Sequence, residues 1–342
     1  MARNKSALQA FVEQRWYHRP GLLGLLAPLE ALFIAASRRR RQKKQSVEFD
    51  VPVVVVGNIS VGGTGKTPVV KALVAHLRAL GRNPGVVSRG YGRATTGVLM
   101  VENASTARQV GDEPLEIRRS CDVPTVVGED RVAAVEFLLA RAACDVVISD
   151  DGLQHYRLGR QFEIAVVDGS KGLGNGHCLP VGPLREPPHR LAEVDAVLIS
   201  GAKSAISFVP AAATVFTYAV KPAKLVNVRS GEVRPVDWVA GFEKFTAIAG
   251  IGNPEKFFST LTDLLPPEYP AFARRQFADH HQFTEADFRD LDRDTALLMT
   301  EKDSVKCVKF ARDNWWYLAV DAVLDTRFYT LLGRVLSQPI SD

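Results

Sequence analysis

The stretch "VVVVGNISVGGTGKTPVV", residues 53–70, joins a short apolar run to a loop that is rich in glycine. Val53 to Val56 are too few for a helix, and a continuous apolar run of this length is typical of a central parallel strand covered on both faces. The glycines let backbone N–H groups converge on an anion, and a helix opening at Thr67-Pro68 adds its positive end to that field. We therefore expect a strand, a phosphate-binding loop and a helix that runs to Gly81.

This loop predicts a nucleotide site. Lys66 is placed to reach the β- and γ-phosphates, and the Thr67 hydroxyl to ligate Mg²⁺. The usual pattern, G-x-x-x-x-G-K-[ST], has glycine where this chain has Ser60, a departure that concerns nucleotide affinity more than reaction type. A glycine-rich turn without a ligand is the alternative, and the flanking strand and helix count against it. The expected nucleotide contacts are Ser60, Val61, Gly62, Gly63, Thr64, Gly65, Lys66 and Thr67.

Length and composition describe an ordinary globular protein. The chain has 342 residues, 46% hydrophobic and 24% charged, which leaves room for two domains. Its net charge of +5 is compatible with nucleic acid, anionic lipid or a phosphorylated substrate, so the distribution of charge must decide among them. The four cysteines lie far apart without metal-ligand spacing, which indicates buried thiols in a reducing compartment.

Residues 1–45 differ from the rest of the chain. An apolar stretch at 21–37 contains Pro28 and Glu30, and six cations follow within 38–44. A cleaved signal peptide is unfavourable, because a basic run follows the stretch and export would separate a nucleotide-binding protein from ATP. A spanning helix and a helix packed on the protein's own core remain alternatives. We favour an interfacial helix on the cytoplasmic face, since each cation near an anionic leaflet contributes about 1 kcal/mol.

Beyond the loop, apolar runs alternate with helical patterns such as 131–143, which predicts a doubly wound, mostly parallel α/β sheet. Ligands bind beyond the carboxyl ends of the strands in such sheets. "VVISDDGLQH" (146–155) places Asp150 and Asp151 there, and such carboxylates hold Mg²⁺ directly or through water. The expected strands after the loop are 84–88, 123–127, 144–149, 162–167 and 195–200.

Three further loops carry polar side chains of interest. "SRGYG" (88–92) suits phosphate or sugar contact, or is an ordinary glycine turn. "GDEP" (111–114) places Asp112 and Glu113 near a helix start, where carboxylates are favourable in any case. The Gly- and Pro-rich segment 174–190 is either a surface insertion or a loop that binds an acceptor substrate.

The pattern becomes richer in β-structure from about residue 204. We expect a core domain at 46–203 and a smaller α/β lobe at 204–342, which faces the core across a cleft. Asp279, His280 and His281 precede a helix start in that lobe, where Thr284 and Asp287 resemble a capping box. Its other expected elements are strands at 213–220, 296–306 and 315–320, a hairpin at 224–236 and a strand–turn–helix unit at 244–257.

In order, these features resemble the tetraacyldisaccharide 4′-kinases, the lipid A 4′-kinases of Gram-negative bacteria. The motifs that carry the resemblance are "GNISVGGTGKTP", "SRGYG", "GDEP", "SDDGLQH", "LREP" and "FADHHQF", together with the N-terminal helix. The resemblance implies a P-loop kinase that moves the γ-phosphoryl of ATP to the 4′-hydroxyl of a tetraacylated glucosamine disaccharide 1-phosphate. That reaction forms lipid IVA at the inner membrane, with Mg²⁺ and without nucleic acid or an evident protein partner.

The resemblance also implies roles for individual residues. Asp112 and His280 match a catalytic Asp/His dyad, and His281 beside His280 leaves the choice of histidine open. Lys66 joins the dyad as a catalytic cation, and the metal ligands implied are Thr67, Asp150 and Asp151. Contacts with substrate or phosphate are implied for Arg89, Tyr91, Arg131, Arg185 and Glu186.

Two other classes share parts of this pattern. P-loop partitioning or metal-insertion NTPases share "GGTGKT", but many of them carry a lysine just before the paired glycines, where this chain has Val61. A nucleic-acid-dependent ATPase would explain the positive charge. That charge, however, clusters at 38–44 beside an apolar helix, and no stacking platform or recognition helix is evident.

Overall fold

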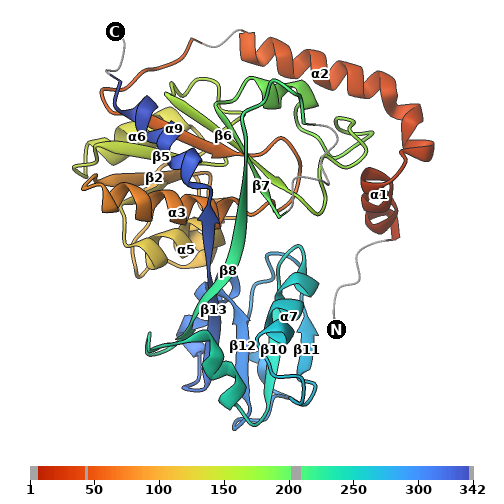
Figure 1. Ribbon diagram of the computed structural model, residues 1–342, viewed down its shortest axis with the longest axis vertical. Helices are drawn as coiled ribbons and strands as arrows, with labels where there is room; N and C mark the ends of the chain where they lie inside the picture. The colour runs from red at the N-terminus through yellow and green to blue at the C-terminus, as the bar shows by residue number, and fades with distance from the viewer. Residues whose placement is uncertain (1–6, 43–44, 202–208, 339–342) are drawn as a thin grey trace.

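The computed structural model describes residues 7–42, 45–201 and 209–338. Its strands form a single sheet with the order β11-β10-β12-β13-β8-β7-β6-β1-β5-β2-β4-β3, and β9 pairs with β8. Figure 1 shows two lobes joined by the long strands β8 and β13. The strands are β1 (Val53–Gly57), β2 (Pro84–Ser88), β3 (Leu99–Met100), β4 (Thr125–Val127), β5 (Val146–Asp150), β6 (Phe162–Asp168), β7 (Ala196–Ser200), β8 (Val215–Asn227), β9 (Val233–Arg234), β10 (Phe245–Ala249), β11 (Ala273–Gln276), β12 (Ala296–Thr300) and β13 (Trp315–Leu324).

Helices cover both faces of the sheet. They are α1 (Ala7–Tyr17), α2 (Ala27–Gln42), α3 (Lys66–Ala79), α4 (Ala107–Val110), α5 (Asp112–Cys121), α6 (Arg131–Leu139), α7 (Pro254–Asp263), α8 (Glu301–Cys307) and α9 (Thr326–Leu336), with short 3₁₀ turns between them. In the larger lobe α3 and α9 pack on one face, and α6 packs on the other. The predicted doubly wound α/β core is confirmed.

The expected central strand is confirmed as β1. It pairs in parallel with β5 on one side and β6 on the other, and all five of its residues are buried. This double burial explains the uninterrupted run of valines. The predicted helix at 131–143 ends earlier, at Leu139.

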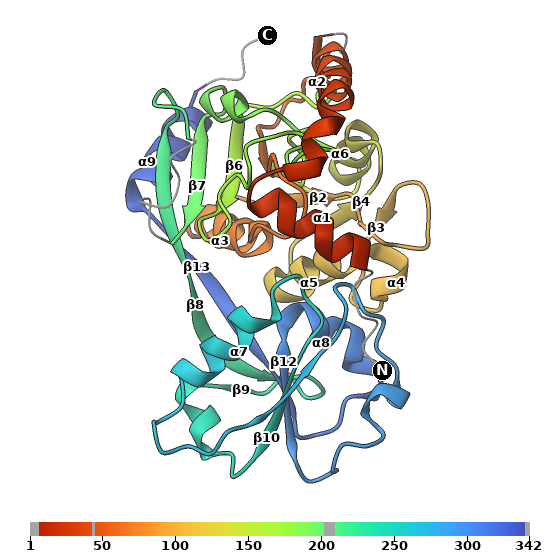
Figure 2. The same cartoon turned by 90° about the vertical axis from the view of Figure 1, so that its right-hand side faces the viewer.

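The connection between the lobes differs from the prediction. Instead of a strand at 213–220 and a separate first strand of the hairpin expected at 224–236, β8 runs unbroken for 13 residues. Its first part pairs with β7 in the larger lobe, and most of its length pairs antiparallel with β13. Two long strands therefore carry the chain into and out of the smaller lobe, as Figure 2 also shows.

Two assignments in the C-terminal part need correction. The expected strand at 296–306 ends at Thr300, whose hydroxyl accepts from the Asp303 N–H at 3.1 Å and starts α8. Helix α9 falls within the stretch expected to form the smaller lobe, 204–342. It packs instead on the larger lobe, because Phe328 and Leu332 are buried in the core of that lobe. The expected capping box at Thr284 is confirmed, whereas the predicted boundary near 203–204 lies outside the described residues.

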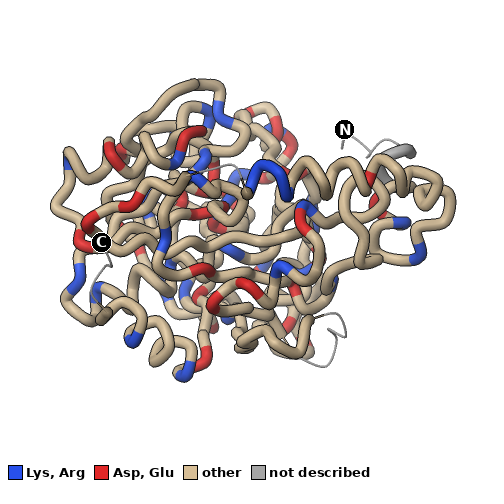
Figure 3. The backbone as a smooth tube through the Cα atoms, turned by 90° about the horizontal axis from the view of Figure 1, so that it is seen from above, with Lys and Arg blue, Asp and Glu red and all other residues tan. Residues whose placement is uncertain are grey.

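The N-terminal helices lie along the larger lobe (Figures 1 and 2). Glu30 of α2 accepts from the Cys178 N–H at 2.6 Å and lies 3.0 Å from the His177 ring, while Phe33 packs on the lobe's core. Among the described residues, Gly21–Gln42 is the segment apolar and long enough to cross a membrane, with mean hydropathy 1.4. Its basic end forms one continuous blue stretch in Figure 3, and Lys43 and Lys44 lie outside the described residues.

Candidate active site

The phosphate loop lies between β1 and α3 at the carboxyl edge of the sheet. Gly62 and Gly65 have φ of +91° and +84°, a region that favours glycine. A Cβ on Gly65 would lie 2.7 Å from the Tyr218 hydroxyl, so a side chain there would require the Tyr218 side chain to move. Gly63 to Thr67 line a cavity of about 290 Å³, to which both lobes contribute.

Ser60 and Val61 lie at the base of the loop and are not among the residues that line this cavity. The Val61 N–H donates to the Pro183 carbonyl at 2.8 Å, and Ser60 forms a β-bridge with Leu184. Because these backbone groups pair with the segment before Arg185, they anchor the loop to the "LREP" motif. Their expected contact with nucleotide has no counterpart in the cavity lining.

Lys66 meets an acidic side chain from the end of β5. Its Nζ lies 3.3 Å from Asp151 Oδ1 and 3.2 Å from Asn58 Oδ1. Arg185 also approaches Asp151, at 3.4 Å. Burial opposes ionisation of Asp151, but Lys66 and Arg185 outweigh it and lower the pKa of Asp151 to about 2. Asp151 is therefore a fixed negative charge beside the phosphate loop.

Asp150 is buried one residue earlier. Its Oδ2 accepts from the Ser88 hydroxyl at 2.9 Å, while its Oδ1 has no hydrogen-bond partner among the described residues. Burial, with the nearby Glu113 carboxylate, raises the pKa of Asp150 well above its usual range. A buried, unpaired acceptor at such a site is explained when a cation or its water shell occupies that side.

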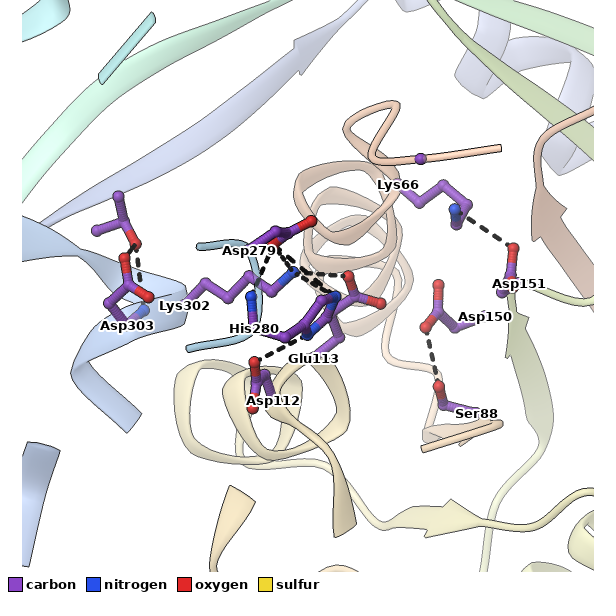
Figure 4. A network of polar contacts seen from close by, with 12 residues as sticks. Lys66, Ser88, Asp112, Glu113, Asp150, Asp151, Asp279, His280, Lys302 and Asp303 are labelled. Carbon is purple, nitrogen blue, oxygen red and sulfur yellow. Dashed lines mark hydrogen bonds and ion pairs between the residues drawn. The ribbon is translucent and has the colours of Figure 1, made fainter. Parts of the chain in front are cut away.

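The two halves of the expected dyad meet across the lobes. His280 Nδ1 lies 3.0 Å from Asp112 Oδ2, although 168 positions separate them in the chain. His280 has φ of +59°, and strain of this kind in a non-glycine residue clusters at functional sites. Burial of Asp112 opposes its ionisation, but the bond from His280 and the Lys306 ammonium lower its pKa. Figure 4 shows this pair in one view with the Lys66–Asp151 pair.

The neighbouring histidine points elsewhere. The His281 ring lies 4.8 Å from the rings of both Phe277 and Phe283, inside an aromatic cluster of the smaller lobe. Its Nε2 lies 3.3 Å from Asp287, not from Asp112. Of the two histidines, the structure therefore brings His280 to the carboxylate.

The residues expected to contact substrate fall into two groups. Arg89 and Tyr91 are exposed, and the Tyr91 ring lies 5.4 Å from the His280 ring. Arg131 and Glu186 are instead buried. Because neither presents its side chain at the surface, both are placed to support the site and not to contact an acceptor directly.

Their hydrogen bonds show what they support. Arg131 donates to the Gly128 carbonyl and, at 3.3 Å, to the Asp150 carbonyl, and burial lowers its pKa to about 10. Glu186 accepts from Gln154 and Tyr156, both at 2.6 Å. Arg131 thus braces the end of β5, and Glu186 holds the segment that carries Arg185.

Several site residues had no role in the sequence analysis. Lys302 and Lys306 of α8 reach the dyad, and Glu301 pairs with Lys71 of α3 at 2.6 Å across the lobes. They were missed because 296–306 was interpreted as a strand. The signal was present, since T-x-x-D at 300–303 follows the pattern of a helix N-terminal cap.

Comparison with known proteins agrees with this geometry. The model of the Tetraacyldisaccharide-1-P 4′-kinase family matches residues 22–337. Proteins named tetraacyldisaccharide 4′-kinase from Pseudomonas putida strain GB-1 and Pseudomonas aeruginosa strain LESB58 are each 45% identical. The match covers 95% of this chain and 97% of the Pseudomonas putida protein, and 93% of this chain and 97% of the Pseudomonas aeruginosa protein.

A solved structure is also similar. LpxK from Aquifex aeolicus, crystallised in complex with ATP, has a TM-score of 0.77 and 26% identity, over 92% of this chain and 99% of its own. The match thus extends over both lobes, which share the cavity beside the phosphate loop. Sequence, fold and site therefore agree that the chain belongs to the tetraacyldisaccharide-1-P 4′-kinase family.

Proposed function

We propose that this protein transfers the γ-phosphoryl group of ATP to the 4′-hydroxyl of a tetraacylated disaccharide 1-phosphate, the reaction in lipid A biosynthesis that forms lipid IVA. One observation carries the proposal: in a member of this family, Asp112 of the larger lobe meets His280 of the smaller lobe, and their neighbours Glu113 and Asp279 line the cavity beside the phosphate loop. The partitioning or metal-insertion NTPase is not favoured, since the relatives carry the name of a lipid kinase.

In this function the phosphate loop and its lysine bind the nucleotide. Gly63 to Thr67 line the cavity, so their backbone N–H groups are available to the phosphates, and Lys66 adds a positive charge. The cavity lining also includes the apolar side chains of Ile251, Phe257 and Leu318, which suit a nucleobase. Phosphoryl transfer depends mostly on such positioning and charge neutralisation.

Mg²⁺ fits the donors that the chain provides here. Thr67, Asp150 and Asp151 would hold it together with the phosphates, and the unpaired Asp150 Oδ1 has the chemistry of such a ligand. In the described part of the chain, no three or more acidic, histidine or cysteine side chains are grouped so as to hold a metal ion by themselves. When bound, the ion would neutralise charge on the transferring group.

Asp112 orients the acceptor hydroxyl. Its lowered pKa keeps the carboxylate ionised, and therefore able to accept a hydrogen bond from the sugar 4′-hydroxyl. Because the transition state of phosphoryl transfer is loose, the hydroxyl proton can pass to this carboxylate late in the reaction. We propose that Arg89 and Tyr91, whose loop brings the Tyr91 ring near His280, and Arg185, which lies near Asp151, contact the acceptor or its phosphates.

For location, we propose a helix that lies in the cytoplasmic interface of the inner membrane and does not span it. Contacts tie the segment to the larger lobe along its length: Trp16 donates to the Pro180 carbonyl at 3.1 Å, Glu30 binds the Cys178 N–H, and Arg41 pairs with Glu193. A spanning helix would have to break these contacts. The outward face of the segment instead exposes leucines, which suit the acyl boundary.

A transfer assay tests the proposed reaction. Purified protein with γ-labelled ATP, Mg²⁺ and tetraacyldisaccharide 1-phosphate in mixed micelles should move label into the lipid fraction. The Asp112→Asn variant, which keeps the shape of the side chain but not its charge, should lose transfer and retain ATP binding. Label that appears only as inorganic phosphate, at equal rates with and without lipid, would support the NTPase alternative.

A further inference from the structure

Two lysines of α8 point at the dyad from the smaller lobe. Lys302 and Lys306 are four residues apart and so share one face of the helix. Lys306 Nζ lies 3.6 Å from Asp112 Oδ2 and 2.8 Å from Asp303 Oδ1. Lys302 Nζ lies 3.4 Å from His280 Nε2, the ring nitrogen that does not face Asp112.

The contact between Lys302 and His280 restricts where the ring proton lies. An ammonium group has three donors and no acceptor, so the ring nitrogen beside it must present its lone pair. If Nε2 accepts from Lys302, the proton of the neutral ring is on Nδ1. The 3.0 Å contact is then a hydrogen bond that Nδ1–H donates to Asp112 Oδ2.

Lys302 is held in the charged state that this argument needs. Burial opposes its charge, but Glu113 and Asp279 outweigh that effect and raise the pKa of Lys302. Its Nζ lies 3.4 Å from Glu113 Oε1 and 3.5 Å from Asp279 Oδ1. The ammonium therefore has two carboxylate partners besides the ring, and these fix its position.

The groups around the ring oppose one another. At Nε2 the Asp279 carboxylate oxygen lies 3.8 Å away and the Lys302 ammonium nitrogen 3.4 Å away, so the nearer group is a hydrogen-bond donor. The charged and titratable groups that face His280 are Asp112 and Glu113 from α5, Lys302 and Lys306 from α8, Asp279 from its own loop and Tyr91 from the loop after β2. Lys302 is the one in this set that touches Nε2 as a donor.

We propose that Lys302 is a positioning residue that holds His280 as the neutral Nδ1–H tautomer, so that the ring donates to Asp112. This rests on the proposed function only for its effect on rate, since the tautomer is a property of the protein without substrate. In the opposite tautomer, Nδ1 of His280 would present a lone pair to the Asp112 carboxylate. Of the two described partners of that carboxylate, only Lys306 would then orient it. For the hydrogen-bond partners that orient metal-ligating histidines, loss of this orientation typically costs about 10- to 100-fold in activity, and we expect an effect of the same size here.

The test combines spectroscopy with kinetics. In protein with ¹⁵N-labelled histidine, long-range ¹H–¹⁵N spectra distinguish a protonated ring nitrogen from one with a lone pair, and His280→Gln assigns the signals. Wild type should show protonated Nδ1 and unprotonated Nε2 at His280. Lys302→Met, which keeps the length but not the charge, should lose this preference and lower kcat about 10- to 100-fold, with the KM for ATP within about 2-fold.

Matched variants separate positioning from general damage. Lys302→Arg keeps charge and donors and should restore the tautomer and most of kcat. Lys309→Met, at an exposed lysine just beyond α8, should match wild type in both readouts. A wild-type His280 protonated at Nε2, or a Lys302→Met protein that keeps both its tautomer and its kcat, would overturn the proposal. If Lys302→Met fails to fold, the wild-type spectrum still decides, and it does so even if the lipid is not the acceptor.

Discussion

The exposed leucines at the N-terminus allow the proposed membrane attachment to be tested quantitatively. Leu22, Leu25, Leu29 and Leu32 follow helical spacing along one face, and Leu22 and Leu25 are 70% and 80% exposed. We predict that the double change Leu22→Gln with Leu25→Gln releases the protein from anionic vesicles without unfolding it. No described contact with the larger lobe depends on either side chain, because neither belongs to its core.

The size of the effect follows from the exposed area. Leu22 is 70% exposed and Leu25 is 80% exposed, so together they present the surface of about one and a half fully exposed leucines. Moving a whole leucine side chain out of water contributes about 2 kcal/mol, so the double change should cost about 3 kcal/mol of membrane binding. That corresponds to roughly a 100-fold weaker partition into the vesicle.

Sedimentation with vesicles of phosphatidylethanolamine and phosphatidylglycerol measures this partition. Leu80→Gln is the matched control, since Leu80 is 59% exposed but ends α3 on the opposite face of the sheet. Binding by wild type should also weaken with salt, because the charges of Arg38 to Arg41 are screened. Partition that is unchanged in the double variant, or attachment that resists both salt and carbonate, would refute the interfacial helix in favour of another mode of attachment.

Three further predictions concern the site. Lys66→Ala should lower phosphoryl transfer at least 10²-fold while circular dichroism stays unchanged, because it removes a charge aimed at the phosphates and no core packing; near-normal turnover would contradict the phosphate-loop role. Asp112→Ala and His280→Ala should each lower kcat roughly 10²- to 10⁴-fold, and the double variant little more than the worse single, since groups that act as a unit are non-additive; additive losses in the same kinetics would mean separate roles. Burial, with Arg131 and Arg89, lowers the pKa of His155 to about 4 from 6.5. As the pH falls below 6.5, His155 therefore binds a proton more readily in the unfolded chain than in the folded one, and at pH 5 this difference should cost about 2 kcal/mol of folding stability. Urea titrations at pH 7 and pH 5 measure this loss, which should be largely absent in the His155→Gln variant; an equal loss in both proteins would contradict the assignment to His155.

The sequence by itself determined the elements whose causes are local. A run of valines, four glycines and a lysine within residues 53–67 specify strand, loop and helix start, because backbone sterics and burial act over a few neighbours. The apolar N-terminal segment and the basic run that follows it can likewise be identified from neighbouring residues alone. So can the capping box at Thr284, since both of its partners lie within four residues of chain.

Tertiary structure decided what depends on distant partners. A single β8 exists because β13, about 100 residues later, pairs along most of its length, and α9 joins the larger lobe because its apolar face finds a core there. Adjacent histidines carry no local signal that separates them. His280 was distinguished from His281 only when a turn at φ +59° directed one ring to Asp112 and packing drew the other into an aromatic cluster.

Burial decided the roles of the remaining candidates. Arg131 and Glu186 have the charges of substrate ligands in the sequence, but the fold covers both and gives each of them internal hydrogen bonds. Lys302 gained a role only when α8 docked against α5 and brought its ammonium to the His280 ring. Periodicity along a chain shows which face of an element is buried. The packing of whole elements, in contrast, decides which charged residues meet when they are as far apart in sequence as Asp112 and His280, which 168 positions separate.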